Sequence, residues 1–198
     1  MTKPSTRADR AQRIAGVSAF RRITRCSAVI ATALLLAATV WTVATARLVQ
    51  KPHLDPVVRS DAVVVLGEPD AAAMRRAHEL LKQGVSSRLV LIIPYGAPPD
   101  CAHPPTGVTV TCVVPDPSTT QGDARAIGRL AREHHLGRIV VITWPTHISR
   151  SRMLIQRCYA GKLVMTGYRH ALSSRTAQLH EQLYQSVAYL KASLVRGC

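Results

Sequence analysis

His147 and Arg150 are the two residues whose types and spacing most directly indicate chemistry. They lie three positions apart, just after an apolar run that ends at Thr143, where a helix is expected to begin. Residues at this spacing share one face of a helix, and the free backbone N–H groups of a helix N-terminus favour an anion. Arg150 could bind a phosphate or carboxylate through two parallel hydrogen bonds. His147 could donate to the same group or exchange a proton with it.

Three other loops are expected at the same place, because each follows a predicted strand and the carboxyl ends of parallel strands meet at one edge of a sheet. Thr119 and Thr120, at the start of the helix expected at 120–135, would add hydroxyls and further free N–H groups. The predicted ligand-binding residues are Gly67, Glu68, Tyr95, Gly96, Thr119, Thr120, Asp123, His147 and Arg150.

Simpler interpretations of these residues stay open. His147 could cap its helix, and Arg150 could be an ordinary surface arginine. Glu68 and Asp70 could form a carboxylate pair, although a solvated loop followed by a helix cap is favoured. Thr120, with Asp123 three residues later, resembles a capping box, with Asp in place of the usual Glu.

Several classes of enzyme are disfavoured. Ser118, Ser149 and Ser151 lack the G-x-S-x-G elbow of a hydrolase. The segment that follows the first strand does not have the G-x-G-x-x-G pattern of a nicotinamide dinucleotide site. The cysteines and histidines show no spacing typical of a zinc site. No catalytic residue, metal or cofactor is therefore assigned.

The elements that must position these residues alternate between strand and helix. Continuous apolar runs indicate strands buried on both faces, as in a parallel sheet. The predicted elements are strands at 61–67, 88–93, 108–114, 138–143 and 163–166, and helices at 71–83, 120–135, 147–159 and 175–195. The third strand alternates Thr with Val and is expected near an edge, and residues 94–106 are expected to be irregular. This order predicts a three-layer, Rossmann-like α/β domain with a mainly parallel sheet.

The predicted last helix carries a regular apolar stripe. Its large apolar residues recur every three or four positions, which places them on one helical face. They are Leu179, Leu183, Val187, Leu190 and Leu194.

Residues 26–46 form a run of 21 residues without charge, which is about the length needed to cross the hydrocarbon of a bilayer. Seven basic residues and one acid precede it, so the N-terminus is expected to stay cytoplasmic and the rest of the chain to face outward. The expected parts are a basic arm (1–25), a transmembrane helix (26–46), a linker (47–60) and an α/β domain (61–198). A buried soluble helix and a signal peptide cleaved after Ala46 are the alternatives.

Four of the five cysteines fall in the expected outer domain, where disulfides form. Sequence alone allows three pairings. We expect Cys101–Cys112, which closes a short proline-rich segment, and Cys158–Cys198, which ties the C-terminal tail to a helix. Cys112 and Cys158 could instead be small buried apolar residues.

The motifs DAVVVLG, LLKQG, RLVLI, STTQGDA and GRIVVITWPTHISRSRMLIQRCYAG, in this order over residues 61–167, resemble the YdcF-like family, which includes the SanA-like vancomycin-exclusion proteins. The H-x-x-R of His147 and Arg150 is the strongest match. The resemblance implies a Rossmann-like fold behind an N-terminal anchor, an anionic, phosphate- or nucleotide-like small ligand, and a role in cell-envelope integrity.

The sequence departs from the family's pattern at several positions. Glu68 follows Gly67 where a second Gly is usual, and Ala73 stands where an Arg is expected. The family's Ser-Gly-Gly appears as Pro94-Tyr95-Gly96, and its N-T-x-E-N-A as residues 119–124. These departures put the family's ligand and any catalysis in question.

Two functions therefore follow from the sequence. The first is an anchored outer protein that binds, and could process, an anionic small ligand. The second is a non-catalytic envelope scaffold whose net positive charge contacts anionic polymers or partner proteins. The charge of +15 also suggests nucleic acid, but an outward-facing domain argues against that partner. The expected partners are the membrane and the anionic ligand or polymer.

Overall fold

The computed structural model of the 198-residue chain describes residues 7–94, 96, 98–168 and 174–198, with side chains from Ser27 onward. Two compact units are present, Met1–Val43 and Ala44–Cys198. Helix α1 (Arg7–Gln50) supplies the described part of the first unit and the first residues of the second. Its segment Ser27–Gln50 is long and apolar enough to cross a membrane. The helix continues past Ala46, so the expected linker begins as helix.

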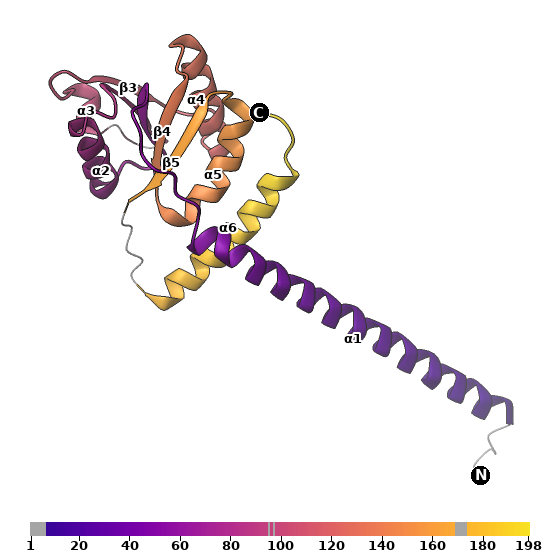
Figure 1. Ribbon diagram of the computed structural model, residues 1–198. Helices are drawn as coiled ribbons and strands as arrows, with labels where there is room; N and C mark the ends of the chain where they lie inside the picture. The colour runs from indigo at the N-terminus through magenta and orange to yellow at the C-terminus, as the bar shows by residue number, and fades with distance from the viewer. Residues whose placement is uncertain (1–6, 95, 97, 169–173) are drawn as a thin grey trace. The chain divides into compact units, whose positions relative to one another are not determined.

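The second unit is built on a five-stranded parallel sheet with helices on both faces (Figure 1). The strand order is β3-β2-β1-β4-β5, which places β3 at an edge as predicted. The strands are β1 (Ala62–Val65), β2 (Arg88–Ile92), β3 (Thr109–Val113), β4 (Arg138–Thr143) and β5 (Lys162–Gly167). The helices are α2 (Ala71–Lys82), α3 (Pro99–Ala102), α4 (Thr120–Glu133), α5 (Pro145–Cys158) and α6 (Arg175–Leu194). The three-layer α/β prediction is confirmed.

The central strands are buried on both faces, which explains their unbroken apolar runs. In β1, Val64 packs with α4 and α5 on one face, while its neighbours Val63 and Val65 pack with α2 on the other. Strand β1 pairs with β2 on one side and β4 on the other. After β1, the chain adds β2 and then β3 on one side of β1. It then crosses back and adds β4 and β5 on the other side. Ligands of such sheets bind where the strand order reverses, outside the carboxyl ends.

Two local features differ from the sequence-based expectations, and a third, the exposure of the α6 stripe, was not predicted. The proline-rich segment contains the short helix α3, where Pro99 occupies a first-turn position at which no backbone donor is needed. Thr119, and not Thr120, caps α4 by accepting from the Gly122 N–H at 3.2 Å. The apolar stripe of α6 is exposed, while the adjoining polar residues Gln182, Gln185 and Ser186 are buried.

The two predicted cysteine pairs lie at disulfide distance. Cys101 and Cys112 have Cα atoms 6.0 Å apart, and Cys158 and Cys198 have Cα atoms 4.8 Å apart. The first pair joins α3 to β3, and the second joins the end of α5 to the last residue of the chain. Both pairs belong to the second unit.

Candidate functional site

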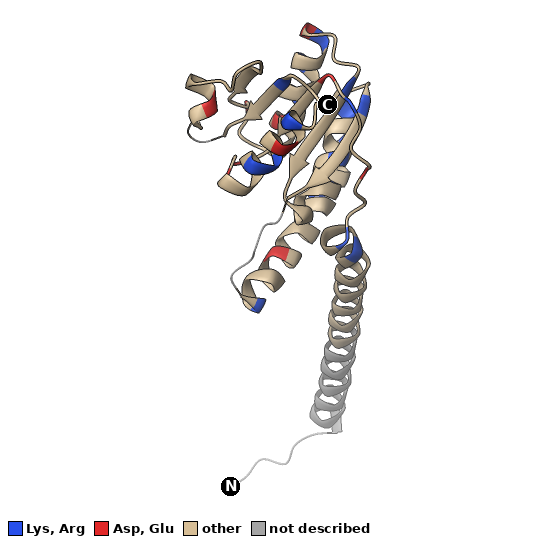
Figure 2. Ribbon diagram, turned by 60° about the vertical axis from the view of Figure 1, so that its left-hand side comes forward, with Lys and Arg blue, Asp and Glu red and all other residues tan. Residues whose placement is uncertain are grey.

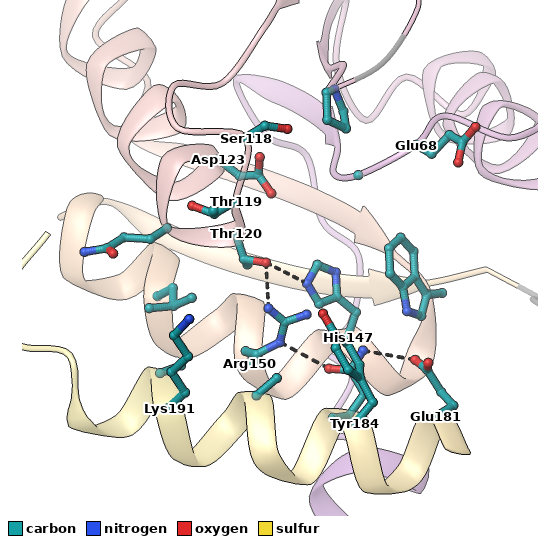
Figure 3. Close-up of a pocket in the computed structure, with 18 of the residues that line it drawn as sticks. Glu68, Ser118, Thr119, Thr120, Asp123, His147, Arg150, Glu181, Tyr184 and Lys191 are labelled. Atoms are coloured by element: carbon teal, nitrogen blue, oxygen red, sulfur yellow. Dashed lines mark hydrogen bonds between the residues drawn. The ribbon is translucent and has the colours of Figure 1, made fainter. Parts of the chain in front are cut away.

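A pocket of about 840 Å³ lies at the carboxyl edge of the sheet, beside the point where the strand order reverses (Figure 3). The loop after β1, the N-termini of α4 and α5, and one side of α6 form its walls. Its polar and aromatic lining residues are Glu68, Asp70, Ser118, Thr119, Thr120, Gln121, Asp123, Trp144, His147, Arg150, Tyr168, Glu181, Tyr184, Gln185 and Lys191.

His147 is held in one orientation at the bottom of this pocket. Its side chain is 3% exposed and stacks on the Trp144 ring, with ring centroids 4.6 Å apart. Its Nδ1 lies 3.1 Å from the Thr143 hydroxyl and its Nε2 lies 3.2 Å from the Thr120 hydroxyl. Burial, with the nearby Arg150 charge, holds the pKa of His147 well below its ordinary value. A neutral imidazole has one donor and one acceptor, which suits two hydroxyls that can each play either role.

Arg150 brings a positive charge into the pocket. Its Nη1 donates to the Thr120 hydroxyl at 2.7 Å, and its Nε donates to the Gln185 side-chain oxygen at 3.1 Å. Burial lowers the pKa of Arg150, but a guanidinium stays protonated in proteins. Thr120 therefore connects Arg150 with His147, two residues of α5, to the N-terminus of α4.

A second chain of hydrogen bonds fixes α6 against α5. The Gln185 amide donates to Glu181 at 3.0 Å, and the Thr146 hydroxyl donates to the same oxygen at 2.8 Å. Gln185 thus bridges the Arg150 guanidinium and the Glu181 carboxylate. Polar side chains thus hold the wall of the pocket formed by α6, which Val187, Ala188 and Ala192 also line.

Asp123 lies in the first turn of α4 and lines the pocket near Arg150 (Figure 3). Burial raises its pKa to about 7, and the opposing effect of the Arg150 charge is smaller. The carboxyl is therefore near half protonation at neutral pH. A group in this state can either donate or accept a proton, as general acids and bases do.

The opposite wall is acidic and aromatic. Asp70 caps α2 through bonds from Ala72 and Ala73 N–H groups, and its second oxygen accepts from the Tyr168 hydroxyl at 3.2 Å. Figure 3 shows Glu68 and Lys191 at opposite sides of the pocket. The cations Arg150 and Lys191 thus lie away from Glu68, while the carboxyl groups of Asp123 and Glu181 lie close enough to Arg150 to act on its charge.

Gly67 sets the shape of the loop after β1. Its φ of +86° is a backbone conformation that favours glycine, and a Cβ there would lie 2.7 Å from the Trp144 ring. The glycine lets this loop approach the aromatic ring that supports His147.

The structure brings most of the predicted residues together. Seven of the nine line the pocket: Gly67, Glu68, Thr119, Thr120, Asp123, His147 and Arg150. Gly96 does not line it, and Tyr95 lies outside the described residues.

The geometry argues against the simpler interpretations of His147 and Arg150. Trp144 occupies the cap position of α5, so His147 is not a helix cap, and Arg150 is partly buried within the pocket. Asp70 is a helix cap, as favoured. Among the residues that the structure describes, no cluster of three or more His, Cys, Asp or Glu side chains could hold a metal ion.

Sequence reasoning missed the contribution of α6 and of Thr143. Glu181, Gln185 and Lys191 gave no signal as a site, because their polar types are ordinary on an exposed helix face. The one available signal was the apolar stripe on the other side of α6. It could have indicated that the side with Glu181 and Gln185 is turned inward.

Comparison with models of known protein families and with curated protein sequences finds no match to this chain. The resemblance to the YdcF-like family therefore stays a prediction from the sequence motifs.

Proposed function

We propose that this protein is a membrane-anchored, divergent YdcF-like protein that binds an anionic small ligand carrying a phosphate group. The pocket that contains the Arg150 guanidinium is the observation that carries the proposal, because a flat, filled edge would have favoured a scaffold. The guanidinium can form two parallel, charge-assisted hydrogen bonds to a phosphate. The first-turn N–H groups of α4 add donors beside it.

Asp123 and His147 have different roles in this proposal. Protonated Asp123 donates a hydrogen bond to a ligand oxygen, while ionised Asp123 repels it. Neutral His147 keeps the Thr120 hydroxyl in place between α4 and Arg150. The volume of about 840 Å³ leaves room for more than an inorganic anion, so a nucleotide-like or other phosphorylated molecule is the expected class.

The apolar helix α1 and its flanking charges support a membrane location. We place the N-terminus in the cytoplasm and the α/β unit outside, where the ligand would be a component of the cell envelope. The basic residues of the α/β unit are distributed over several elements (Figure 2). A non-catalytic scaffold that uses this charge is the alternative, and it does not need the pocket.

Calorimetry on the full chain in detergent micelles tests the binding function, with inorganic phosphate, AMP and adenosine as probes. We expect the two phosphate-bearing probes to bind and adenosine to bind much more weakly. Arg150→Gln is expected to weaken binding of AMP by roughly tenfold or more, because a charge-assisted hydrogen bond contributes about 1.5–3 kcal/mol. Lys191→Gln, at an exposed residue, is expected to weaken it less.

Arg129→Gln is the matched control, since Arg129 is exposed on α4 and does not line the pocket. It removes the same charge and is expected to leave the affinity unchanged. Equal binding of AMP and adenosine, or normal AMP binding by both the Arg150 and Lys191 variants, would contradict the proposal. Binding that depends only on total charge and salt would favour the scaffold.

A further inference from the structure

Helix α6 has its apolar side turned outward. Leu179, Leu183, Leu190 and Leu194 are 39% to 73% exposed, as is Val187, which also lines the pocket, whereas Gln182, Gln185 and Ser186 are at most 5% exposed. A surface helix normally does the reverse. A row of exposed large apolar side chains marks a surface that contacts something else.

The inward polar side of α6 is explained by the molecule itself. Gln185 bridges Arg150 and Glu181 in the pocket. Ser186 accepts a hydrogen bond from Thr45 at 2.8 Å, and Gln182 donates to Ser186 at 3.3 Å. The outward leucines have no such explanation within the described part of the chain.

The contact between Ser186 and Thr45 attaches α6 to the C-terminal turns of α1. Thr45 belongs to the last turns of α1 and is the second-last residue of the charge-free run. Thr45 and Val49, one turn apart, are each 2% exposed. The Ser149 hydroxyl of α5 donates to the Leu48 carbonyl of the same turns. If α1 crosses a membrane, the middle of α6 is therefore held at the level where the chain leaves the hydrocarbon.

The apolar stripe lies on the correct side of α6 for lipid contact. At about 100° per residue, Leu179, Leu183 and Leu190 lie within about 60° of Ser186 around the helix axis. They therefore lie beside the edge of α6 that contacts α1, and Ser186 marks the border between the buried and the exposed sides of the helix. Glu181 and Gln185, which line the pocket, lie on the other side.

The charges near the stripe suit an anionic lipid surface. Arg175, Lys191 and Arg196 are exposed on or just after α6, and Arg47 and Lys51 are exposed where the apolar run ends. Most of the α6 ribbon is uncharged (Figure 2). Basic residues beside an apolar helix face are typical of helices that lie in the membrane interface.

We propose that α6 lies on the surface of the bilayer that α1 enters, with its exposed leucines in the boundary between headgroups and acyl chains. This proposal rests on α1 being a membrane anchor. It adds a second membrane contact to the α/β unit and makes α6 the layer between the lipid surface and the pocket. The orientation of the pocket relative to the membrane is then fixed by two elements.

Site-specific photo-crosslinking of the full chain tests this contact. Benzoylphenylalanine replaces Leu183 or Leu190 in protein reconstituted into vesicles of phosphatidylcholine and phosphatidylglycerol. Both positions are expected to crosslink to lipid, as detected by mass spectrometry. Glu133, exposed at the end of α4, is the control position and is expected not to crosslink. Benzoylphenylalanine in place of Leu35, within the apolar run, tests whether α1 lies in the bilayer.

The outcomes separate the two ideas. Lipid crosslinks at Leu35 but not at Leu183 or Leu190 would overturn the α6 proposal and leave the anchor intact. No lipid crosslink at Leu35 would overturn the anchor, and the α6 proposal with it. Crosslinks from Leu183 to a second copy of the chain would assign the stripe to a dimer interface instead.

A charge variant provides a second measurement. Leu179 carries the crosslinker, and Leu183 and Leu190 are both changed to Asp. Each leucine is exposed in the structure, so the changes leave the core intact. We expect lipid crosslinking at position 179 to fall by roughly tenfold or more, because burial of two leucines in the interface is lost. Unchanged crosslinking would contradict the proposal.

Discussion

At the scale of single residues, burial determines which protonation states the pocket holds. His147 is neutral because an imidazolium would be desolvated beside the Arg150 charge. Asp123 titrates near neutral pH because desolvation outweighs the attraction of the same arginine. The two groups are therefore suited to different tasks, His147 to positioning and Asp123 to proton exchange.

Asp123→Asn is expected to remove part of the pH dependence of unfolding. Burial raises the pKa of Asp123 from 3.8 to about 7, so the folded protein binds the extra proton. The stability contributed by this group is fully present at a pH below the pKa of Asp123 in the unfolded chain. It is lost as the pH rises from about 4 to about 7. The neutral amide does not titrate.

Thermal unfolding of the full chain in detergent, followed by circular dichroism, measures this effect. Between about pH 5 and about pH 8, the wild type is expected to lose roughly 1–3 kcal/mol more stability than the Asp123→Asn variant. Comparing the two proteins cancels the titration of the other carboxylates. An identical pH response in both would show that Asp123 is ionised normally in the folded state.

At the scale of elements, the segment before β1 is held more firmly than its sequence indicates. The Asp55 N–H donates to the Met165 carbonyl at 3.0 Å, and its carboxylate accepts from the Met165 N–H at 2.7 Å. Arg152 donates to the same carboxylate oxygen at 2.8 Å and to the His53 carbonyl at 2.8 Å. These bonds attach the chain that follows α1 to β5 and α5.

Asp55→Asn tests whether this attachment stabilises the second unit. Burial acts to raise the pKa of Asp55, but the Met165 N–H and Arg152 together hold it below its ordinary value. Its stabilisation is therefore present above about pH 4 and is lost as the pH falls. At neutral pH, the amide is expected to cost roughly 1–3 kcal/mol, because it leaves Arg152 without its anion.

Urea unfolding midpoints provide the measurement for Asp55→Asn. Glu79→Gln is the matched control, since Glu79 forms an exposed ion pair with Arg76 at 3.1 Å. Loss of an exposed pair is expected to cost less than about 0.5 kcal/mol. Equal midpoints for the two variants would mean that the contacts of Asp55 do not contribute to stability.

At the scale of the whole molecule, the cysteines report on the compartment. The pairs Cys101–Cys112 and Cys158–Cys198 both lie in the second unit, and Cys26 lies in α1. Disulfides persist in oxidising compartments. The proposed topology, with the second unit outside the cell, therefore requires both pairs to be oxidised in the mature protein.

Alkylation followed by mass spectrometry checks this requirement. Protein extracted from membranes without reductant is expected to take up label at Cys26 alone. The same sample, reduced before labelling, is expected to carry label at all five cysteines, which serves as the internal control. Label on four or five cysteines without reduction would contradict the proposed topology.

Patterns along the chain were sufficient to predict the α/β fold, the apolar N-terminal helix and seven residues that line the pocket. A buried parallel strand requires an unbroken apolar run, and an amphipathic helix requires apolar residues every three or four positions. Each element can therefore be predicted from a local stretch of sequence. Parallel strands also share one carboxyl edge, which explains why Gly67, Thr120 and His147 meet.

Contacts between distant segments could be read only from the three-dimensional arrangement. The spacing of the α6 leucines shows that they share a face, but it does not show that this face points outward. Likewise, Thr120 has the sequence context of a helix cap, yet its hydroxyl meets Arg150 and Thr119 takes the cap. Both outcomes depend on partners tens of residues away, and local patterns carry no information about such partners.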